Sequence, residues 1–120
     1  MDYEFENNYL GRPSAKFSMG HEAFGRWFTE DLSNDIVLVD QILSSIAQIE
    51  DKAIGRKTFR GNAFELTVEL EQASVRNLWL DYESEEELGD DLELFDQELM
   101  SDCGLTDFKD TLVSWREFIA

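Results

Sequence analysis

Alternation of hydrophobic and polar residues opens the chain and predicts a hairpin of two strands. Within residues 2–9 aromatic and acidic side chains alternate, with Tyr3 and Phe5 on one side. A period of two is the signature of a half-buried strand. After a turn around residues 8–13, a second alternating run covers residues 14–19, so we expect the two runs to pair as an antiparallel hairpin.

Residues 20–28 have a less regular pattern, because Gly20 and Gly25 interrupt it. We expect a further short strand or an irregular segment here. Its large apolar side chains, Phe24, Trp27 and Phe28, are expected to pack inward.

A helical pattern begins in the next stretch, and it predicts a helix over 34–53. Hydrophobic residues recur there at steps of three and four, which marks one buried face; they are Val39, Ile42, Leu43, Ile46, Ile49 and Ala53. Asp31, Ser33 or Asn34 can cap its beginning, and Gly55 is placed to end it in a left-handed conformation.

A three-stranded meander is predicted after this helix. The Gly61-Asn62 pair is typical of a two-residue hairpin turn. Residues 63–70 then alternate between apolar and polar positions, and a second turn near residues 71–73 leads into an apolar run at 74–82. A sheet with one apolar and one polar face needs a helical layer over the apolar face.

Two further helices are predicted in the last third of the chain. Residues 85–99 carry an apolar stripe at helical spacing and follow Ser84, which fits a capping box, although a loop is the open alternative. Residues 107–119 have a clearer pattern, with Thr106 as the expected N-cap and Asp107 in the first turn. The buried stripe of this last helix is expected to consist of Phe108, Leu112, Trp115 and Ile119.

These elements predict a single α+β domain over residues 1–120. Its antiparallel sheet would combine the N-terminal hairpin with the central three-stranded meander, and two or three helices would pack on one face. The 42% hydrophobic content, with nine Phe, three Trp and three Tyr, is enough for a folded core. We expect a cytoplasmic protein, because no apolar run is long enough for a membrane span, the N-terminus is acidic, and one cysteine cannot form an internal disulfide.

Charge changes this picture. The net charge is −17, and it is uneven: residues 1–62 carry seven basic and ten acidic residues, and residues 63–120 carry three basic and seventeen acidic ones. Such a field repels nucleic acid and anionic membranes and favours a basic partner. We therefore expect neither direct nucleic-acid binding nor membrane binding. The small basic cluster of Arg56, Lys57 and Arg60 is expected to form ion pairs.

The acidic residues of the second half form the candidate partner-binding surface. Its members are Glu65, Glu69, Glu71, Glu83, Glu86, Glu87, Asp90, Asp91 and Glu93. A solvated helix face is the ordinary explanation for a charge run. Against it, like charges four residues apart, such as Glu86 and Asp90, destabilise a helix, and residues 81–102 contain no Lys, Arg or His to relieve them.

Nucleic-acid mimicry is the specific form of this hypothesis. A helix over 85–99 would span about 22 Å at about 1.5 Å per residue, and it contains eight acidic residues. That is roughly one charge per 3 Å, against one per about 1.7 Å along duplex DNA.

Metal and cofactor sites are not indicated. The acidic run lacks the glycine and the alternation of a calcium-binding loop, and one His with one Cys cannot form a zinc site. No phosphate-binding, dinucleotide-binding or hydrolase motif occurs. An enzyme with a cleft around His21, aided by Glu22 or with Cys103 as nucleophile, is the competing hypothesis. We expect no cofactor, no metal and no catalytic residue.

Several short motifs together resemble a known family. They are MDYEF at the N-terminus, SMGHE at 18–22, Trp27-Phe28, Val75-Arg76, Cys103-Gly104, Asp107-Phe108 and WREF at 115–118. The chain resembles, over essentially its whole length, the YacL family of small uncharacterised proteins from gamma-proteobacteria. The resemblance implies a short, acidic, cytoplasmic bacterial protein, and it brings no activity and no catalytic residues.

The sequence thus favours a non-enzymatic interaction protein whose acidic half, residues 63–120, binds a basic protein. Two alternatives stay open: the small enzyme with a cleft around His21, and a structural homodimer whose acidity serves only solubility.

Overall fold

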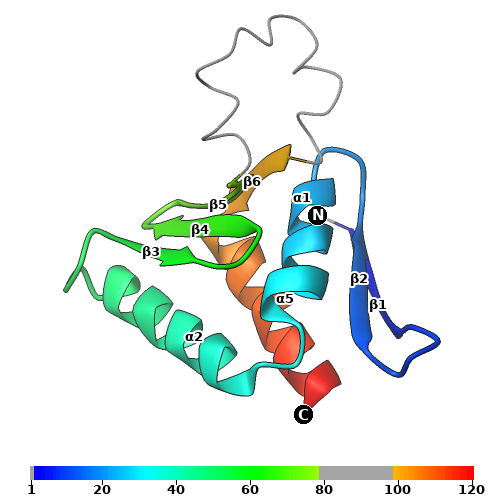
Figure 1. Cartoon of the computed structure of the whole chain (residues 1–120). Coiled ribbons are helices and arrows are strands. Elements are labelled where there is room, and N and C mark those ends of the chain that lie inside the picture. The colour runs from blue at the N-terminus through cyan, green and yellow to red at the C-terminus, as the bar shows by residue number, and fades with distance from the viewer. Residues whose placement is uncertain (1, 79–98) are drawn as a thin grey trace, which may run out of the picture.

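The computed structural model describes residues 2–78 and 99–120, which form two antiparallel sheets and several helices (Figure 1). In chain order the elements are β1 (Tyr3–Asn7), β2 (Pro13–Phe17), α1 (Glu22–Arg26), the π-helix η1 (Trp27–Leu32), α2 (Ile36–Glu50), β3 (Arg56–Arg60), β4 (Phe64–Glu69), β5 (Gln72–Asn77), β6 (Met100–Gly104) and α5 (Leu105–Ile119). The α+β class is confirmed. The expected single sheet is divided: β1 and β2 form one sheet, and β3, β4, β5 and β6 form the other in that order.

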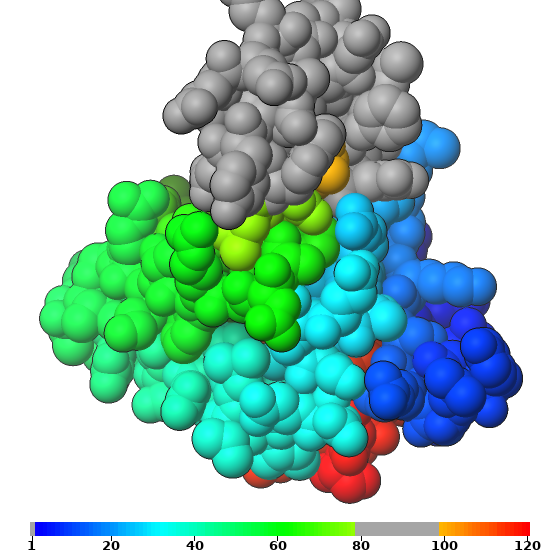
Figure 2. Space-filling model, in the orientation of Figure 1, coloured from blue at the N-terminus to red at the C-terminus, as the bar shows by residue number. Residues whose placement is uncertain are grey.

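Helices separate and cover the two sheets. α1 lies between the four-stranded sheet and the β1–β2 hairpin, and α2 and α5 pack against each other and against the sheet (Figure 1). In the space-filling view, the hairpin in blue lies beside the cyan helical residues, and the green strands lie on their other side (Figure 2). The largest fully buried side chains come from α1, η1, β4 and α5; they are Trp27, Trp115, Phe24, Phe28, Phe64 and Phe108.

Residues 22–32 are helical, so the expectation of a strand or irregular segment there is wrong. Phe24, Trp27 and Phe28 are nevertheless buried as expected, at the i, i+3, i+4 spacing of one helix face. Gly25 suits the helix here because the helix backbone packs closely on β2. A Cβ at position 25 would lie 3.0 Å from the carbonyl oxygen of Ala15, and glycine has none. The glycine that argued against a helix is therefore what lets the helix approach the strand.

The helix α2 is confirmed, with shorter bounds than predicted. Asp35 is its N-cap, and the Asp35 side chain accepts a hydrogen bond from the Leu38 backbone N–H at 3.0 Å. The three predicted capping residues, Asp31, Ser33 and Asn34, do not cap it. Lys52, with φ of +63°, takes the left-handed position after the helix that was expected for Gly55.

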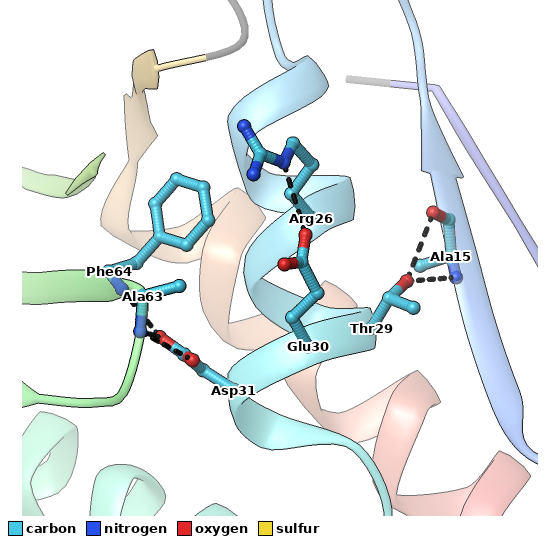
Figure 3. Close-up of polar contacts among 7 residues, drawn as sticks. All are labelled: Ala15, Arg26, Thr29, Glu30, Asp31, Ala63 and Phe64. Carbon is cyan, nitrogen blue, oxygen red and sulfur yellow. Dashed lines mark hydrogen bonds and ion pairs between the residues drawn. The ribbon is translucent and has the colours of Figure 1, made fainter. Parts of the chain in front are cut away.

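The turn between β3 and β4 differs by one residue from the prediction. Arg60 pairs with Glu65, and the Gly61 N–H donates to the Phe64 carbonyl oxygen at 2.8 Å. The two central residues of the turn are therefore 62 and 63, and not Gly61 and Asn62. Asp31 explains the shift. Its carboxylate accepts hydrogen bonds from the backbone N–H groups of Ala63, at 3.0 Å, and of Phe64, at 2.7 Å (Figure 3).

The last helix, α5, is confirmed with a corrected start. Gly104 is its N-cap and no side chain bonds there, so Thr106 is not the cap and lies in the first turn. Phe108, Leu112 and Trp115 are fully buried, as the pattern predicts. The predicted helix over 85–99 lies outside the described residues, apart from Leu99.

An ion pair joins α5 to α2 at the surface. The Arg116 Nε–H donates to Asp40 Oδ1 at 2.6 Å. This hydrogen bond lowers the pKa of the Asp40 carboxyl below its ordinary value. The ion pair stabilises the ionised Asp40 carboxylate in the folded state. Its contribution to the free energy of unfolding is therefore present at neutral pH and is lost as the pH falls through the lowered pKa of Asp40.

Candidate functional site

The face of the four-stranded sheet that points away from the core is polar and arranged in rows across the strands. Core side chains of β4 and β5 alternate with side chains of this outer face. The strand register places three rows on the outer face: Arg60, Glu65, Arg76 and Met100; Thr58, Thr67, Ser74 and Asp102; Arg56, Glu69, Gln72 and Gly104. The face therefore carries both signs of charge.

Two of the predicted acidic site residues are paired on this face. Glu69 Oε1 lies 2.7 Å from Arg56 Nη2, and Glu65 Oε2 lies 3.5 Å from Arg60 Nη1. The expected ion pairs are confirmed for Arg56 and Arg60, since cross-strand neighbours of opposite charge attract, whereas Lys57 makes none among the described residues. Glu65 and Glu69 consequently add little unneutralised charge to the surface, and only the exposed Glu71 of this group is without an ion pair among the described residues.

The other six predicted site residues, Glu83, Glu86, Glu87, Asp90, Asp91 and Glu93, lie outside the described residues. Their charge is evident from the sequence: residues 79–98 contain ten acidic and no basic residues. This segment therefore accounts for −10 of the total charge of −17, and the rest of the chain for −7.

The position of this segment in the topology is well defined at both ends. β5 and β6 are adjacent antiparallel strands, and Arg76 pairs with Met100. A connection between such strands requires about two to five residues. Residues 79–98 exceed that several-fold, so closing the sheet does not account for their length or their charge.

His21 lies at a polar hollow of about 370 Å³, between the start of α1 and the strands β5 and β6. The hollow is lined by Gly20, His21, Ser74, Val75, Arg76, Met100, Ser101 and Asp102. Nδ1 of His21 is buried and has no hydrogen-bond partner in the part of the chain that the structure describes, and the ring stacks on Phe24 with centroids 6.3 Å apart. Glu22 does not assist it, because its carboxylate accepts the Gly20 N–H at 2.7 Å.

The hollow brings His21 together with residues that the sequence did not single out, above all Asp102 and Arg76. The alternation of β5 could have indicated that Ser74 and Arg76 share a face, but only the pairing of β5 with β6 adds Asp102 to it. Within the described residues no hydrogen bond joins the imidazole to a carboxylate or a hydroxyl, so no nucleophile and base are assembled. Nor do the described residues contain a cluster of three potential metal ligands.

Cys103 lies opposite Ala73 in the sheet and packs against the core. Burial raises the pKa of its thiol to about 12, and the nearby carboxylates of Asp107 and Asp102 contribute in the same direction. A thiol with this pKa is almost entirely protonated at neutral pH and is a poor nucleophile.

We therefore expect Cys103 to react slowly with a chromogenic disulfide reagent. At pH 8 the native protein should be labelled at least about 100-fold more slowly than the urea-unfolded protein, since only the thiolate attacks. The rate should rise with pH well beyond pH 9, the ordinary value for a cysteine. Equal labelling rates in the native and unfolded protein would contradict the assignment of Cys103 as a structural residue.

Comparison with known proteins identifies relatives over nearly the whole chain. The profile of UPF0231, described as an uncharacterised protein family, matches residues 1–119. A UPF0231 protein of Shewanella baltica (strain OS223) is 42% identical over 120 residues, covering 99% of this chain and 97% of the relative. A UPF0231 protein of Aliivibrio salmonicida (strain LFI1238) is 40% identical over 120 residues, covering 99% and 98%. No solved structure matches the chain.

Proposed function

The chain belongs to the UPF0231 family, which is the same family as YacL, and because the description of that family names no activity, we propose a function from charge and geometry. The proposal is a non-enzymatic interaction protein whose acidic C-terminal half, residues 63–120, binds a basic protein. Nucleic-acid mimicry is its specific form. None of the helices in the described part of the chain is long and apolar enough to cross a membrane.

The observation that carries the proposal is the concentration of charge in one connection. Residues 79–98 hold ten carboxylates and no cation, and they leave the sheet between two strands that a short turn could join. Elsewhere the remaining seventeen acidic residues share the chain with ten basic ones, and some are paired, as in Glu69–Arg56 and Glu65–Arg60. The interaction surface is therefore assigned mainly to the acids of residues 79–98, whereas Glu71 lies in the turn between β4 and β5, at the other end of β5.

A quadruple substitution tests this assignment. Changing Glu86 and Glu87 to Gln, and Asp90 and Asp91 to Asn, should reduce recovery of a basic protein from a gamma-proteobacterial lysate at least tenfold. The wild-type protein should retain that partner at about 50 mM salt and release it at about 500 mM, because salt screens exposed charges. The fold should be kept or slightly stabilised, since like-charge repulsion falls.

A matched control separates a specific surface from bulk charge. Glu4, Asp51, Asp110 and Glu117 are exposed and make no ion pair in the described part of the chain, so neutralising these four changes the net charge equally. The control should bind like the wild type. Equal losses in both variants, or no basic protein recovered at low salt, would refute the proposal. Competition by duplex DNA for the purified partner tests mimicry itself.

The hollow around His21 supports the alternative, a small enzyme. Asp102 and Arg76 line the same hollow and are titratable neighbours of the kind a catalytic cleft needs. Because the imidazole has no hydrogen-bonded partner among the described residues, the interaction role is the better supported proposal.

A further inference from the structure

β3 is one of the two edge strands of the four-stranded sheet. Among the strands that the structure describes it pairs only with β4, and hydrogen-bonded pairs alternate along antiparallel strands. Since the Gly61 N–H bonds to Phe64, the backbone groups of Phe59 and Lys57 also face β4. Those of Arg56, Thr58 and Arg60 point away from it. By this alternation, the N–H and C=O of Thr58 do not take part in the β3–β4 ladder.

A groove runs between this edge and the helix α2, which lie beside each other in Figure 1. Its volume is about 790 Å³. Val37, Leu38 and Phe59 supply apolar lining, and Val37 is 66% exposed although it is a large aliphatic residue. A strand bordered by a helix across a partly apolar groove is the arrangement in which proteins bind extended peptides by adding a strand.

Basic residues are concentrated at this edge in an otherwise acidic protein. Arg56, Lys57 and Arg60 are three of the ten basic residues of the chain and lie within one five-residue strand. The carboxylates of Glu69 and Glu65 meet the two arginines from the β4 side. Lys57 makes no ion pair in the described part of the chain, and the Arg56 guanidinium has five N–H donors, more than one carboxylate can use.

We propose that the edge of β3 and the groove beside α2 bind an extended acidic segment of a partner protein as an added strand. Carboxylates on alternate residues of that segment would lie opposite Arg56, Thr58 and Arg60. The intervening apolar side chains would enter the groove beside Phe59. This site is separate from the acidic surface proposed above and does not depend on it.

Salt limits how far the overall negative charge acts on this edge. The Debye length at physiological salt is about 8 Å, so exposed charges farther away than that are largely screened. Arg56, Lys57 and Arg60 place three cations within one five-residue strand, next to the proposed added strand.

A second copy of the chain fits the edge less well. Two β3 strands paired antiparallel about Thr58 would place Arg56 opposite Arg60 of the other copy at both ends. Like charges directly opposite each other destabilise a strand pair. Cations on an edge strand are also a common protection against self-association. The charges that oppose self-pairing are those that attract an acidic strand.

A labelled peptide of alternating glutamate and valine, six residues long and blocked at both ends, tests the proposal. We expect saturable binding with half-saturation below about 1 mM in fluorescence anisotropy at physiological salt. Amide shifts in the NMR spectrum should be confined to residues 56–60 and 37–44. A peptide of alternating lysine and valine should not bind.

Substitutions on β3 identify the mode of binding. Thr58→Pro removes an N–H that the β4 ladder does not use, so the fold should be kept and the affinity should fall at least tenfold. Thr58→Val keeps that N–H and should bind like the wild type. Lys57→Glu lowers the charge of the strand by two units and should weaken binding of the acidic peptide about fivefold through the local field, and it preserves the test if the proline variant fails to fold.

Three outcomes would overturn the proposal: no saturable binding of the glutamate peptide, equal binding of the lysine peptide, or unchanged affinity in both Thr58→Pro and Lys57→Glu. Concentration-dependent dimerisation that Thr58→Pro abolishes would assign the edge to a second copy and overturn it as well. Loss of the basic partner from the acidic surface would leave the peptide result unaffected, so the two proposals fail separately.

Discussion

Replacing Trp115 with alanine is expected to lower the free energy of unfolding by about 3–5 kcal/mol. A small folded protein has a stability of about 5–15 kcal/mol, so the variant should lose a large fraction of its stability. Trp115 is fully buried and contacts the rings of Phe5, Phe28 and Phe118, at centroid distances of 4.9, 5.3 and 5.8 Å. It joins α5 to the N-terminal hairpin and to η1.

Trp115 also forms a long-range hydrogen bond, and losing it adds to the decrease in the free energy of unfolding. Its indole N–H donates to the backbone carbonyl oxygen of Ser33 at 2.8 Å, across 82 residues of sequence. Ser33 has φ of +47°, a conformation that favours glycine, and it lies where η1 ends before α2. The hydrogen bond therefore helps to hold Ser33 in a backbone conformation that is unfavourable for a residue with a side chain.

Urea unfolding followed by circular dichroism measures the Trp115 effect. Trp115→Phe keeps much of the buried area but loses the hydrogen bond, so we expect a loss of about 1–3 kcal/mol. Val113→Ala, at a partly exposed position of the same helix, should cost less than about 1 kcal/mol. A Trp115→Ala variant as stable as Val113→Ala would show that this aromatic cluster does not hold the hairpin to the helices.

The second large effect is expected at Asp31, which connects η1 to the β3–β4 turn. Its carboxylate accepts the N–H groups of Ala63 and Phe64 (Figure 3). Asp31→Ala leaves both donors without this partner, and hydrogen bonds to charged groups contribute about 1.5–3 kcal/mol. We expect a loss of about 2–3 kcal/mol, and faster hydrogen exchange at the Phe64 amide. Asp31→Asn keeps one oxygen acceptor and should lose less.

Gly61 provides an internal check on that contact. A Cβ at Gly61 would lie 2.5 Å from Asp31 Oδ2, so Gly61→Ala must displace the carboxylate or the turn. In a double-mutant cycle, Gly61→Ala should be clearly destabilising in the wild type and much less so in the Asp31→Ala background. We expect a coupling energy of about 1–2 kcal/mol. Strictly additive effects would contradict the direct contact between the two residues.

Local periodicity accounts for the parts of the fold that the sequence predicted well. In α2, Val39, Ile42, Ile46 and Ile49 are all at most 1% exposed, as their spacing requires. In β4 the alternation of buried and outward positions is equally clear. Both periods follow from the geometry of a single element, so each segment carries its own information about which side it buries.

The errors lie where a contact distant in sequence decides the local conformation. Gly25 has a place in the helix because its lack of a Cβ lets β2 approach closely, and Asp31 binds the β3–β4 turn from about thirty residues away. Neither the Gly25 signal nor the Gly61-Asn62 signal contains that information. Propensity is a weak preference that tertiary contacts of this size can override.

The candidate surfaces divide in the same way. The sequence by itself determined the amount of negative charge and its concentration in residues 79–98, because composition does not depend on folding. Only the tertiary structure decided that Glu65 and Glu69 are paired, that Asp102 and His21 line the same hollow, and that β3 is a basic edge strand along a groove. Strand order and register create these neighbours, and they are fixed by burying all the apolar faces at once, which no single segment encodes.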